Sequence, residues 1–394
     1  MLVVVLLSGT AHAAPPSVIV LSWDGVRHDA PTRTPLPGLQ RMAREGAKAE
    51  RLIPVFPSST FPNHVSLATG TYPDRHGIVA NVFRDRNRGL FDFGDDASWL
   101  LAEPIWIAAE RQGVPSATFF WVGSETPWRG RAARYRRKPF DGDLPESEKV
   151  SQILAWLDLP AAERPRLIMS WWRGADGAGH RHGPDSEEAK AALIGQDAEL
   201  TRLLAAIDAR GLWKDLTLLI VSDHGMSLAT EGIDLEAALA PSGMETEILR
   251  STAVAHVFLD NPEQAQRAAT LLNAIPGVDA HLASALPRDL RFGPATRVGD
   301  VVCITQPPYT FRVGVLDRAL RLFHRGVGGH GYPTEHSDVH SVFFALGRGV
   351  TAGTRLGSVR AIDVAPTVAA LLGIAPPEHS EGASIDFGAE PASP

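Results

Sequence analysis

One cysteine, Cys303, is present among the 394 residues. It excludes an intramolecular disulfide framework and any zinc module built on several cysteines. No apolar run after residue 14 approaches the roughly 20 residues that a membrane-spanning helix needs. Glycine and proline are scattered, at 36 and 30 residues, which argues against collagen-like and low-complexity sequence. The composition as a whole, with 44% hydrophobic residues and a net charge of −7, is typical of a globular protein with a large core.

Residues 1–14 form a short apolar run that ends in Ala11-His12-Ala13, the small-x-small pattern that signal peptidase accepts. The run lacks a basic start, and a buried N-terminal strand is the alternative. We interpret residues 1–14 as a signal peptide and expect export to a periplasmic or extracellular space. An oxidising compartment suits a chain with so little cysteine.

Apolar runs predict buried strands at residues 17–22, 166–170 and 216–222. Helical patterns are found at residues 36–45, 105–112, 149–157, 187–210 and 361–372. This alternation predicts an α/β fold, a mainly parallel sheet with helices on both faces. Residues 227–328 differ, with strands at 253–259 and 298–305 around a helix at 262–275, and predict a small α+β insertion. Residues 15–226 and 329–380 then form the core, and residues 381–394 a tail.

Polar side chains gather at the ends of the predicted strands. They are Asp24, Asp176, His180, Asp223, His224 and, much later in the chain, His330. Ligands of parallel sheets bind beyond the carboxyl ends of the strands, and imidazole and carboxylate are zinc ligands. Each residue alone is explained by a helix cap or a core histidine, whereas the six together predict a metal site.

The spacing of Asp176 and His180 would place both on one face of a helix. Glycines at positions 174, 177 and 179 favour instead a loop that folds tightly round an ion. We therefore expect a loop at this position.

Thr60 directly precedes a predicted helix, in the segment Phe56-Pro-Ser-Ser-Thr60-Phe-Pro-Asn-His64. Its hydroxyl is either a plain N-cap or a nucleophile placed where free backbone amides favour an anion. A nearby cation would lower the pKa of the hydroxyl and make it a competent nucleophile at neutral pH. Local sequence leaves both roles open.

Six segments in register resemble the nucleotide pyrophosphatase/phosphodiesterase family of the alkaline phosphatase superfamily. They span residues 22–27, 54–64, 70–81, 176–184, 222–226 and 329–332. The similarity runs from about Val18 to Leu372. It implies an alkaline-phosphatase-like core and a zinc-dependent hydrolase of phosphodiester or pyrophosphate bonds that acts on a small-molecule phosphodiester or nucleotide.

The resemblance also implies two zinc ions per chain and assigns their ligands by motif position. One zinc would be held by Asp24, Asp223, His224 and Thr60, and the other by Asp176, His180 and His330. Thr60 would attack phosphorus and form a phosphothreonine, while Asn81 would donate to a phosphate oxygen. Phe61 takes the position where the family stacks a nucleobase or packs another leaving group.

Trp171, Trp172 and Phe140 are aromatic candidates for the opposite wall of that substrate site, with core packing as the alternative. The pattern leaves more than one candidate for the sixth metal ligand, because family members often continue Gly-His-Gly-Tyr with Asp and this chain has Pro333. His336 and His340 therefore compete with His330, which the matched motif favours.

Three other functions stay open: a phosphomonoesterase, a lysophospholipid or choline-phosphate diesterase of the same superfamily, and an exported metal-binding protein. The absence of an arginine in a monoester-binding motif disfavours the first, and the presence of the nucleophile and six ligands disfavours the last. Arg129 to Lys138 carry six cations in ten residues, a solvated segment suited to steering anionic substrates. No nucleic-acid-binding module accompanies it, and the sequence predicts no oligomeric state.

Overall fold

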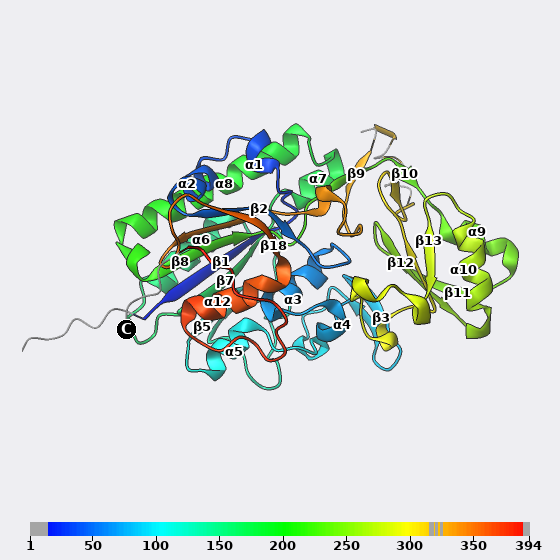
Figure 1. Ribbon diagram of the computed structural model, residues 1–394, viewed down its shortest axis with the longest axis horizontal. Helices are drawn as coiled ribbons and strands as arrows, with labels where there is room; N and C mark the ends of the chain where they lie inside the picture. The colour runs from blue at the N-terminus through cyan, green and yellow to red at the C-terminus, as the bar shows by residue number, and fades with distance from the viewer. Residues whose placement is uncertain (1–14, 315–318, 320–321, 324–325, 389–394) are drawn as a thin grey trace, which may run out of the picture.

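An eight-stranded sheet forms the centre of the computed structural model, which describes residues 15–314, 319, 322–323 and 326–388 (Figure 1). The predicted signal peptide lies outside these residues. The strand order is β18-β2-β17-β8-β1-β7-β5-β6. The strands are β1 (Ser17–Trp23), β2 (Ala47–Ile53), β5 (Ser116–Phe119), β6 (Tyr135–Arg137), β7 (Leu167–Trp172), β8 (Leu216–Val221), β17 (Phe343–Gly347) and β18 (Thr354–Arg360). Only β17 runs antiparallel to its neighbours, so the sheet is mixed and mainly parallel.

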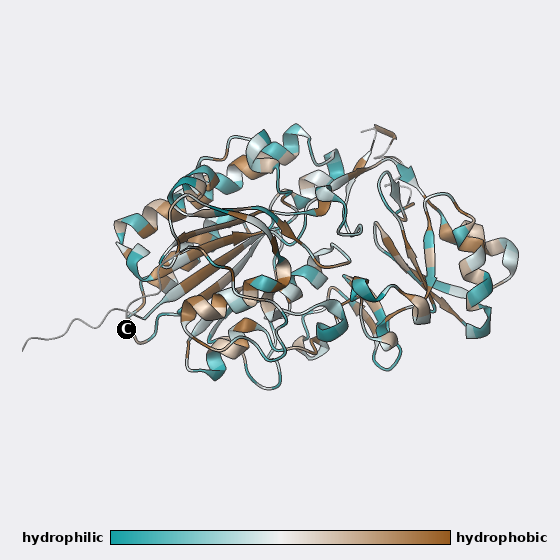
Figure 2. Cartoon of the chain, viewed as in Figure 1, coloured by the Kyte–Doolittle hydropathy of each residue, from teal (hydrophilic) through white to brown (hydrophobic). Residues whose placement is uncertain are grey.

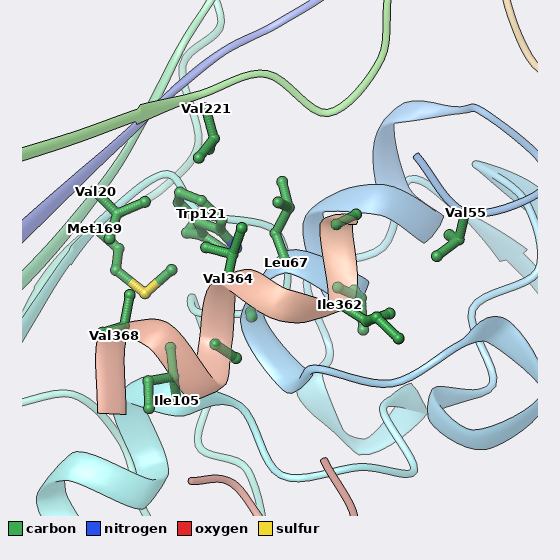
Figure 3. Close-up of a cluster of buried hydrophobic side chains, with 14 of the residues drawn as sticks. Val20, Val55, Leu67, Ile105, Trp121, Met169, Val221, Ile362, Val364 and Val368 are labelled. Carbon is green, nitrogen blue, oxygen red and sulfur yellow. The ribbon is translucent and has the colours of Figure 1, made fainter. Parts of the chain in front are cut away.

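Helices cover both faces of this sheet. One face carries α2 (Pro37–Glu45), α6 (Glu146–Leu157) and α8 (Glu187–Ala209), and the other α3 (Thr60–Thr69), α5 (Ile105–Arg111) and α12 (Val364–Leu372). Along β1, Val18 and Val20 belong to the apolar cluster under α3, α5 and α12 (Figure 3), whereas Ile19 and Leu21 belong to the cluster under α2, α6 and α8. Successive residues of a strand point to opposite faces, so a continuous apolar run builds both cores. The predicted fold class is confirmed.

The predicted loop at Asp176 is wrong. Residues Asp176–His182 form a helix, α7, directly after β7. The glycines serve close packing: a Cβ at Gly179 would lie 2.5 Å from the sulfur of Met226, and one at Gly174 would lie 2.1 Å from the backbone oxygen of Asp24. Glycine content at this position therefore reports the neighbours of the helix and not a lack of helix.

A separate four-stranded antiparallel sheet lies beside the core, as Figure 1 shows at the right. Its order is β11 (Thr246–Arg250), β12 (Val254–Leu259), β14 (Val301–Ile304) and β13 (Asp279–Leu282), with α9 (Leu235–Leu239) and α10 (Ala265–Asn273) packed against it. The chain leaves through β9 (Ser227–Ala229) and returns through β16 (Val327–Gly329), which pair with each other. The return strand therefore ends next to His330.

The other elements are short. They are α1 (Ala30–Arg33), α4 (Pro73–His76), the hairpin β3 (Val82–Asp85) and β4 (Gly89–Asp92), and the pair β10 (Glu231–Gly232) and β15 (Tyr309–Thr310). In Figure 2 the central strands are apolar and the outer helices are amphipathic. Residues 381–388 of the predicted tail pack on the core, where Phe387 is buried and the N–H of Glu381 donates to the oxygen of Gly70. Among the described residues, no helix is both long and apolar enough to cross a membrane.

Candidate active site

The polar residues predicted at strand ends meet at one edge of the central sheet. Strand β1 lies between β7 and β8, and all three run parallel. Asp24 follows β1, α7 with Asp176 and His180 follows β7, and Asp223 and His224 follow β8. The carboxyl ends of neighbouring parallel strands lie side by side, which is why segments some 200 residues apart converge.

Asp176, His180 and His330 form the first group of candidate metal-binding side chains. Nε2 of His180 lies 3.2 Å from Oδ1 of Asp176 and 3.1 Å from Nε2 of His330. Nε2 of His330 lies 3.8 Å from the same Asp176 oxygen. Two imidazole nitrogens and one carboxylate oxygen therefore face a common point, and these atom types match the donor set of zinc.

The second group surrounds His224. Its Nε2 lies 3.6 Å from Oδ1 of Asp24, 3.2 Å from Oδ2 of Asp223 and 3.3 Å from the hydroxyl of Thr60. The two groups adjoin, because the rings of His224 and His330 stack with centroids 3.8 Å apart. Ligand atoms of Asp24, Asp176 and His224 also lie within 4.8 Å of one another, so Asp176 borders both groups.

Three carboxylate oxygens in these groups are buried without a hydrogen-bond partner among the described residues. They are Oδ1 of Asp24, Oδ1 of Asp176 and Oδ2 of Asp223. In two of these carboxylates the other oxygen accepts a hydrogen bond. The Trp171 indole donates to Oδ2 of Asp24 at 2.8 Å, and the Gly25 amide donates to Oδ1 of Asp223 at 3.2 Å. Burying a hydrogen-bond acceptor without a partner costs free energy. A bound cation would give these three orphaned oxygens a partner.

The three histidines are oriented by backbone carbonyls. Nδ1 of His180 pairs with the oxygen of Gly328 at 2.9 Å, Nδ1 of His224 with that of Gly225 at 2.8 Å, and Nδ1 of His330 with that of Ser58 at 3.1 Å. A carbonyl only accepts, so each Nδ1 carries the proton and each Nε2 presents its lone pair to the site. This is the tautomer that binds a metal.

The electrostatics of the site also call for positive charge. Burial, with the nearby carboxylates of Asp223 and Asp176, raises the pKa of Asp24 well above its usual value. Burial, with the neighbouring rings of His224 and His180, lowers the pKa of His330 well below the usual value. The three neighbouring carboxylates repel one another, and the neutral His330 ring supplies no positive charge to offset this. Bound divalent cations would offset the repulsion.

Thr60 is the first residue of α3, and the N-cap position belongs to Ser59. Its hydroxyl is directed to His224 rather than to the helix backbone. Oδ1 of Asn81 accepts a hydrogen bond from the amide of Phe61 at 2.9 Å, which holds the side chain beside Thr60. Nδ2 of Asn81 has no hydrogen-bond partner within the described part of the chain and is therefore free to donate to a ligand.

A cavity of about 280 Å³ opens beside Thr60. It is lined by three of the four predicted aromatic residues, Phe61, Phe140 and Trp171, and reaches Asp24 and Asp176. The fourth, Trp172, is fully buried in the core and does not line the cavity. Phe140 is 53% exposed and packs on Trp171 with ring centroids 5.3 Å apart. Trp171 is buried and does two things, since it lines the cavity and its indole fixes Asp24.

Sequence reasoning missed seven further residues of this cavity. Four of them carry aromatic or acidic side chains, namely Phe93, Asp95, Phe120 and Glu125, and the other three are Gly94, Val122 and Gly123. Phe120 directly follows β5, so the strand-end rule applied to residues 116–119 would have found it. Phe93 follows the short hairpin strand β4 and had no comparable signal. Burial, with the nearby Asp95 carboxylate, raises the pKa of Glu125 to about 7.

The competing histidines lie elsewhere. Nε2 of His336 pairs with the side-chain oxygen of Gln306 at 3.1 Å, and Nε2 of His340 pairs with the oxygen of Thr334 at 2.8 Å. The structure brings His330, and neither of these two, to Asp176. His64 supports the site from behind, because its Nδ1 lies 2.9 Å from the oxygen of Thr60 and 3.4 Å from Oδ2 of Asp223.

Known proteins share this architecture. The chain is 38% identical over 218 residues to a pyrophosphatase/phosphodiesterase of Schizosaccharomyces pombe, a match that covers 54% of this chain and 45% of that protein. It is 27% identical over 377 residues to the bis(5'-adenosyl)-triphosphatase of Mus musculus, covering 93% and 80% of the two chains. Several curated relatives are more than twice as long as the region that this chain matches.

Among solved structures, murine ectonucleotide pyrophosphatase/phosphodiesterase 5, an inactive threonine-to-alanine variant in complex with AMP, has the same fold. The TM-score is 0.84 at 23% identity, with 92% of this chain and 96% of that chain covered. The sequence pattern of one family matches residues 18–333, from β1 to just beyond His330. The chain therefore belongs to the type I phosphodiesterase/nucleotide pyrophosphatase family of the alkaline phosphatase superfamily.

Proposed function

We propose that this protein is an exported, zinc-dependent hydrolase of phosphodiester or pyrophosphate bonds in nucleotides or their analogues, with Thr60 as the nucleophile. The observation that carries the proposal is the position of the Thr60 hydroxyl. It lies 3.3 Å from Nε2 of His224, opens into the aromatic cavity and takes no part in capping α3.

Two zinc ions would be held as the sequence motifs imply, one by Asp24, Asp223, His224 and Thr60 and the other by Asp176, His180 and His330. The orphaned oxygens and the shared histidine tautomer support this ligand set. When bound, zinc supplies Lewis-acid chemistry that lowers the pKa of a hydroxyl and stabilises developing negative charge.

The protein groups then have defined tasks. The Thr60 hydroxyl loses its proton, and its oxygen forms a bond to phosphorus as the leaving oxygen departs, so the remaining ester group of the substrate stays on phosphorus. Water afterwards cleaves the bond between phosphorus and the Thr60 oxygen and releases a phosphate monoester. Nδ2 of Asn81 donates to a phosphoryl oxygen, and the N-terminus of α3 favours the negative charge beside Thr60. Phe61 holds an apolar or planar substrate group against Phe140 and Trp171.

The relatives support a nucleotide substrate. One is named a bis(5'-adenosyl)-triphosphatase, and the structural neighbour holds AMP in a variant that is inactive with one threonine replaced by alanine. Export rests on residues 1–14.

The test compares bis-p-nitrophenyl phosphate with p-nitrophenyl phosphate, with and without a chelator. We expect faster diester hydrolysis that the chelator abolishes and zinc restores. A preference for the monoester would favour a phosphomonoesterase, and turnover that survives chelation would contradict the zinc mechanism. A panel of nucleotide, dinucleotide and choline-phosphate diesters then identifies the substrate class.

A further inference from the structure

Residues 129–138 form a basic strip with no acidic residue in it. Its cations are Arg129, Arg131, Arg134, Arg136, Arg137 and Lys138. All but Arg136 are exposed, on a chain whose net charge is −7. Six like charges on one short segment repel one another, so the strip keeps an electrostatic cost that an anionic ligand would relieve.

The cations of the basic strip have no carboxylate partners among the described residues. Arginines elsewhere commonly have one: Arg41 pairs with Asp208 and Arg297 with Asp85. In the strip, the Arg129 guanidinium lies over the Trp128 ring at 4.4 Å, and that of Arg137 lies 5.7 Å from the Phe119 ring. These contacts orient the side chains without neutralising their charge.

The basic strip adjoins the wall of the aromatic cavity, the cavity beside Thr60. It contains β6, the edge strand of the central sheet, which pairs in parallel with β5. The chain beyond β5 supplies Phe120 and Glu125 to the cavity, and the chain beyond β6 supplies Phe140, two residues after Lys138. The Arg136 guanidinium donates to the backbone oxygen of Glu125 at 3.1 Å, which ties the strip to the cavity wall.

The cavity itself is unsuited to extra negative charge. Asp95 and Glu125 are part of its lining, and no lysine or arginine belongs to that lining in the described structure. The cavity therefore suits a neutral or hydrogen-bond-donating group such as a base. The strip, whose cations lack carboxylate partners in the described structure, adjoins the cavity wall at Glu125 and Phe140.

We propose that the basic strip attracts and retains substrates that carry phosphate groups beyond the scissile one, and so favours polyphosphate-containing nucleotides over singly charged diesters. This inference rests on the proposed function for the identity of the substrate. Exposed cations act on anions over about 10 Å at 0.1 M salt, so the strip can attract an anionic substrate without a fixed contact.

The test is a binding measurement that needs no turnover. AMP and ATP share a base and differ in phosphate charge, and each is titrated calorimetrically into zinc-loaded protein carrying Thr60→Ala. Three strip cations are then neutralised together, as Arg131→Gln, Arg134→Gln and Arg137→Gln. The matched control neutralises three exposed arginines that also lack an ion pair in the described structure, as Arg44→Gln, Arg267→Gln and Arg288→Gln.

We expect the strip variant to weaken ATP binding roughly tenfold, AMP binding by no more than about threefold, and both effects to vanish near about 0.5 M salt. The control should change ATP binding by less than about twofold. Equal losses in both variants, equal losses for AMP and ATP, or no ATP binding before the strip is altered would each overturn the proposal.

Catalysis separates the two hypotheses. These measurements use protein with Thr60 restored. If the ATP affinity depends on the strip but the protein hydrolyses no diester, the proposal for the strip is supported and the proposed function is refuted. Chelator-sensitive diester hydrolysis with no effect of the strip would refute the strip alone.

Discussion

The metal-binding groups and the aromatic cavity adjoin at Thr60, yet they are built differently. In the metal-binding groups every histidine is oriented by a carbonyl, and the free carboxylate oxygens are buried. The cavity has half-open walls, with Phe93 and Phe140 more than half exposed. On the proposed function, rigid strand ends would hold the reacting groups, while the cavity that would select the substrate draws part of its wall from loops and the sheet edge.

This contrast separates two kinds of defect. Changes in the metal-binding groups should destroy the chemical step or empty the site, whereas changes in the cavity should alter affinity and leave the chemistry in place.

The largest effect is expected for Thr60→Ala, which removes the nucleophile. Turnover of a diester should fall by at least about 10³-fold, and zinc content should stay largely intact because Asp24, Asp223 and His224 are unchanged. Steady-state kinetics and elemental analysis measure the two quantities. Thr60→Ser, which keeps a hydroxyl, is the matched control and should retain far more activity. Full activity of the alanine variant would refute covalent catalysis.

A second large effect should distinguish His330 from His336. His330→Ala removes one Nε2 from the first group and should lower bound zinc from two ions towards one, with a loss of activity of at least about 10²-fold. His336→Ala removes only a hydrogen bond to Gln306 and should leave both values near those of the unaltered protein. The reverse pattern in the zinc analysis would move the sixth ligand to His336.

Phe61→Ala should act on affinity. The ring packs against Phe93 with centroids 5.4 Å apart and forms part of the cavity beside the nucleophile. Losing it should raise KM for a nucleotide diester about tenfold and change kcat by less than about threefold. A fall in kcat without a change in KM would show that the cavity wall contributes to chemistry, and would remove the contrast between the two regions.

The smallest effect concerns stability and pH. Burial raises the pKa of Glu125 from 4.5 to about 7, so the stabilisation associated with the protonated carboxyl is present below pH 4.5 and is lost as pH rises through 7. Glu125→Gln keeps the shape without the charge. It should raise the free energy of unfolding by about 2 kcal/mol at pH 8 and by close to nothing at pH 4.5. Denaturant unfolding at both pH values measures this, and equal shifts would contradict it.

Much of the core could be predicted, because its signals are local. The runs at residues 17–22, 166–170 and 216–222 are apolar at every position, as a strand buried on both faces requires. An aspartate at the end of each run then falls at the edge where parallel strands place ligands. The same rule predicts that Asp24, Asp176 and Asp223 lie together.

The misses required tertiary information. Gly174 and Gly179 predict a loop by local rules, but the structure needs these glycines for close approach to Asp24 and Met226, which lie far away in the sequence. The bond from Trp171 to Asp24 depends on the register of β7 against β1, where Trp171 pairs with Ser22. Phe93 and Glu125 reach the cavity through a hairpin and a loop whose courses no periodicity records.

The most direct test of the account is to trap the covalent intermediate at Thr60. Protein is mixed with excess nucleotide diester, quenched in acid within milliseconds and digested, and the peptides are analysed by mass spectrometry. The proposed mechanism predicts one added nucleotidyl group on Thr60, in which the threonine oxygen has replaced the leaving oxygen on phosphorus. This group should disappear on longer incubation and never form in the Thr60→Ala protein. A nucleotidyl group on another residue, or active turnover without any modified peptide at early times, would contradict it.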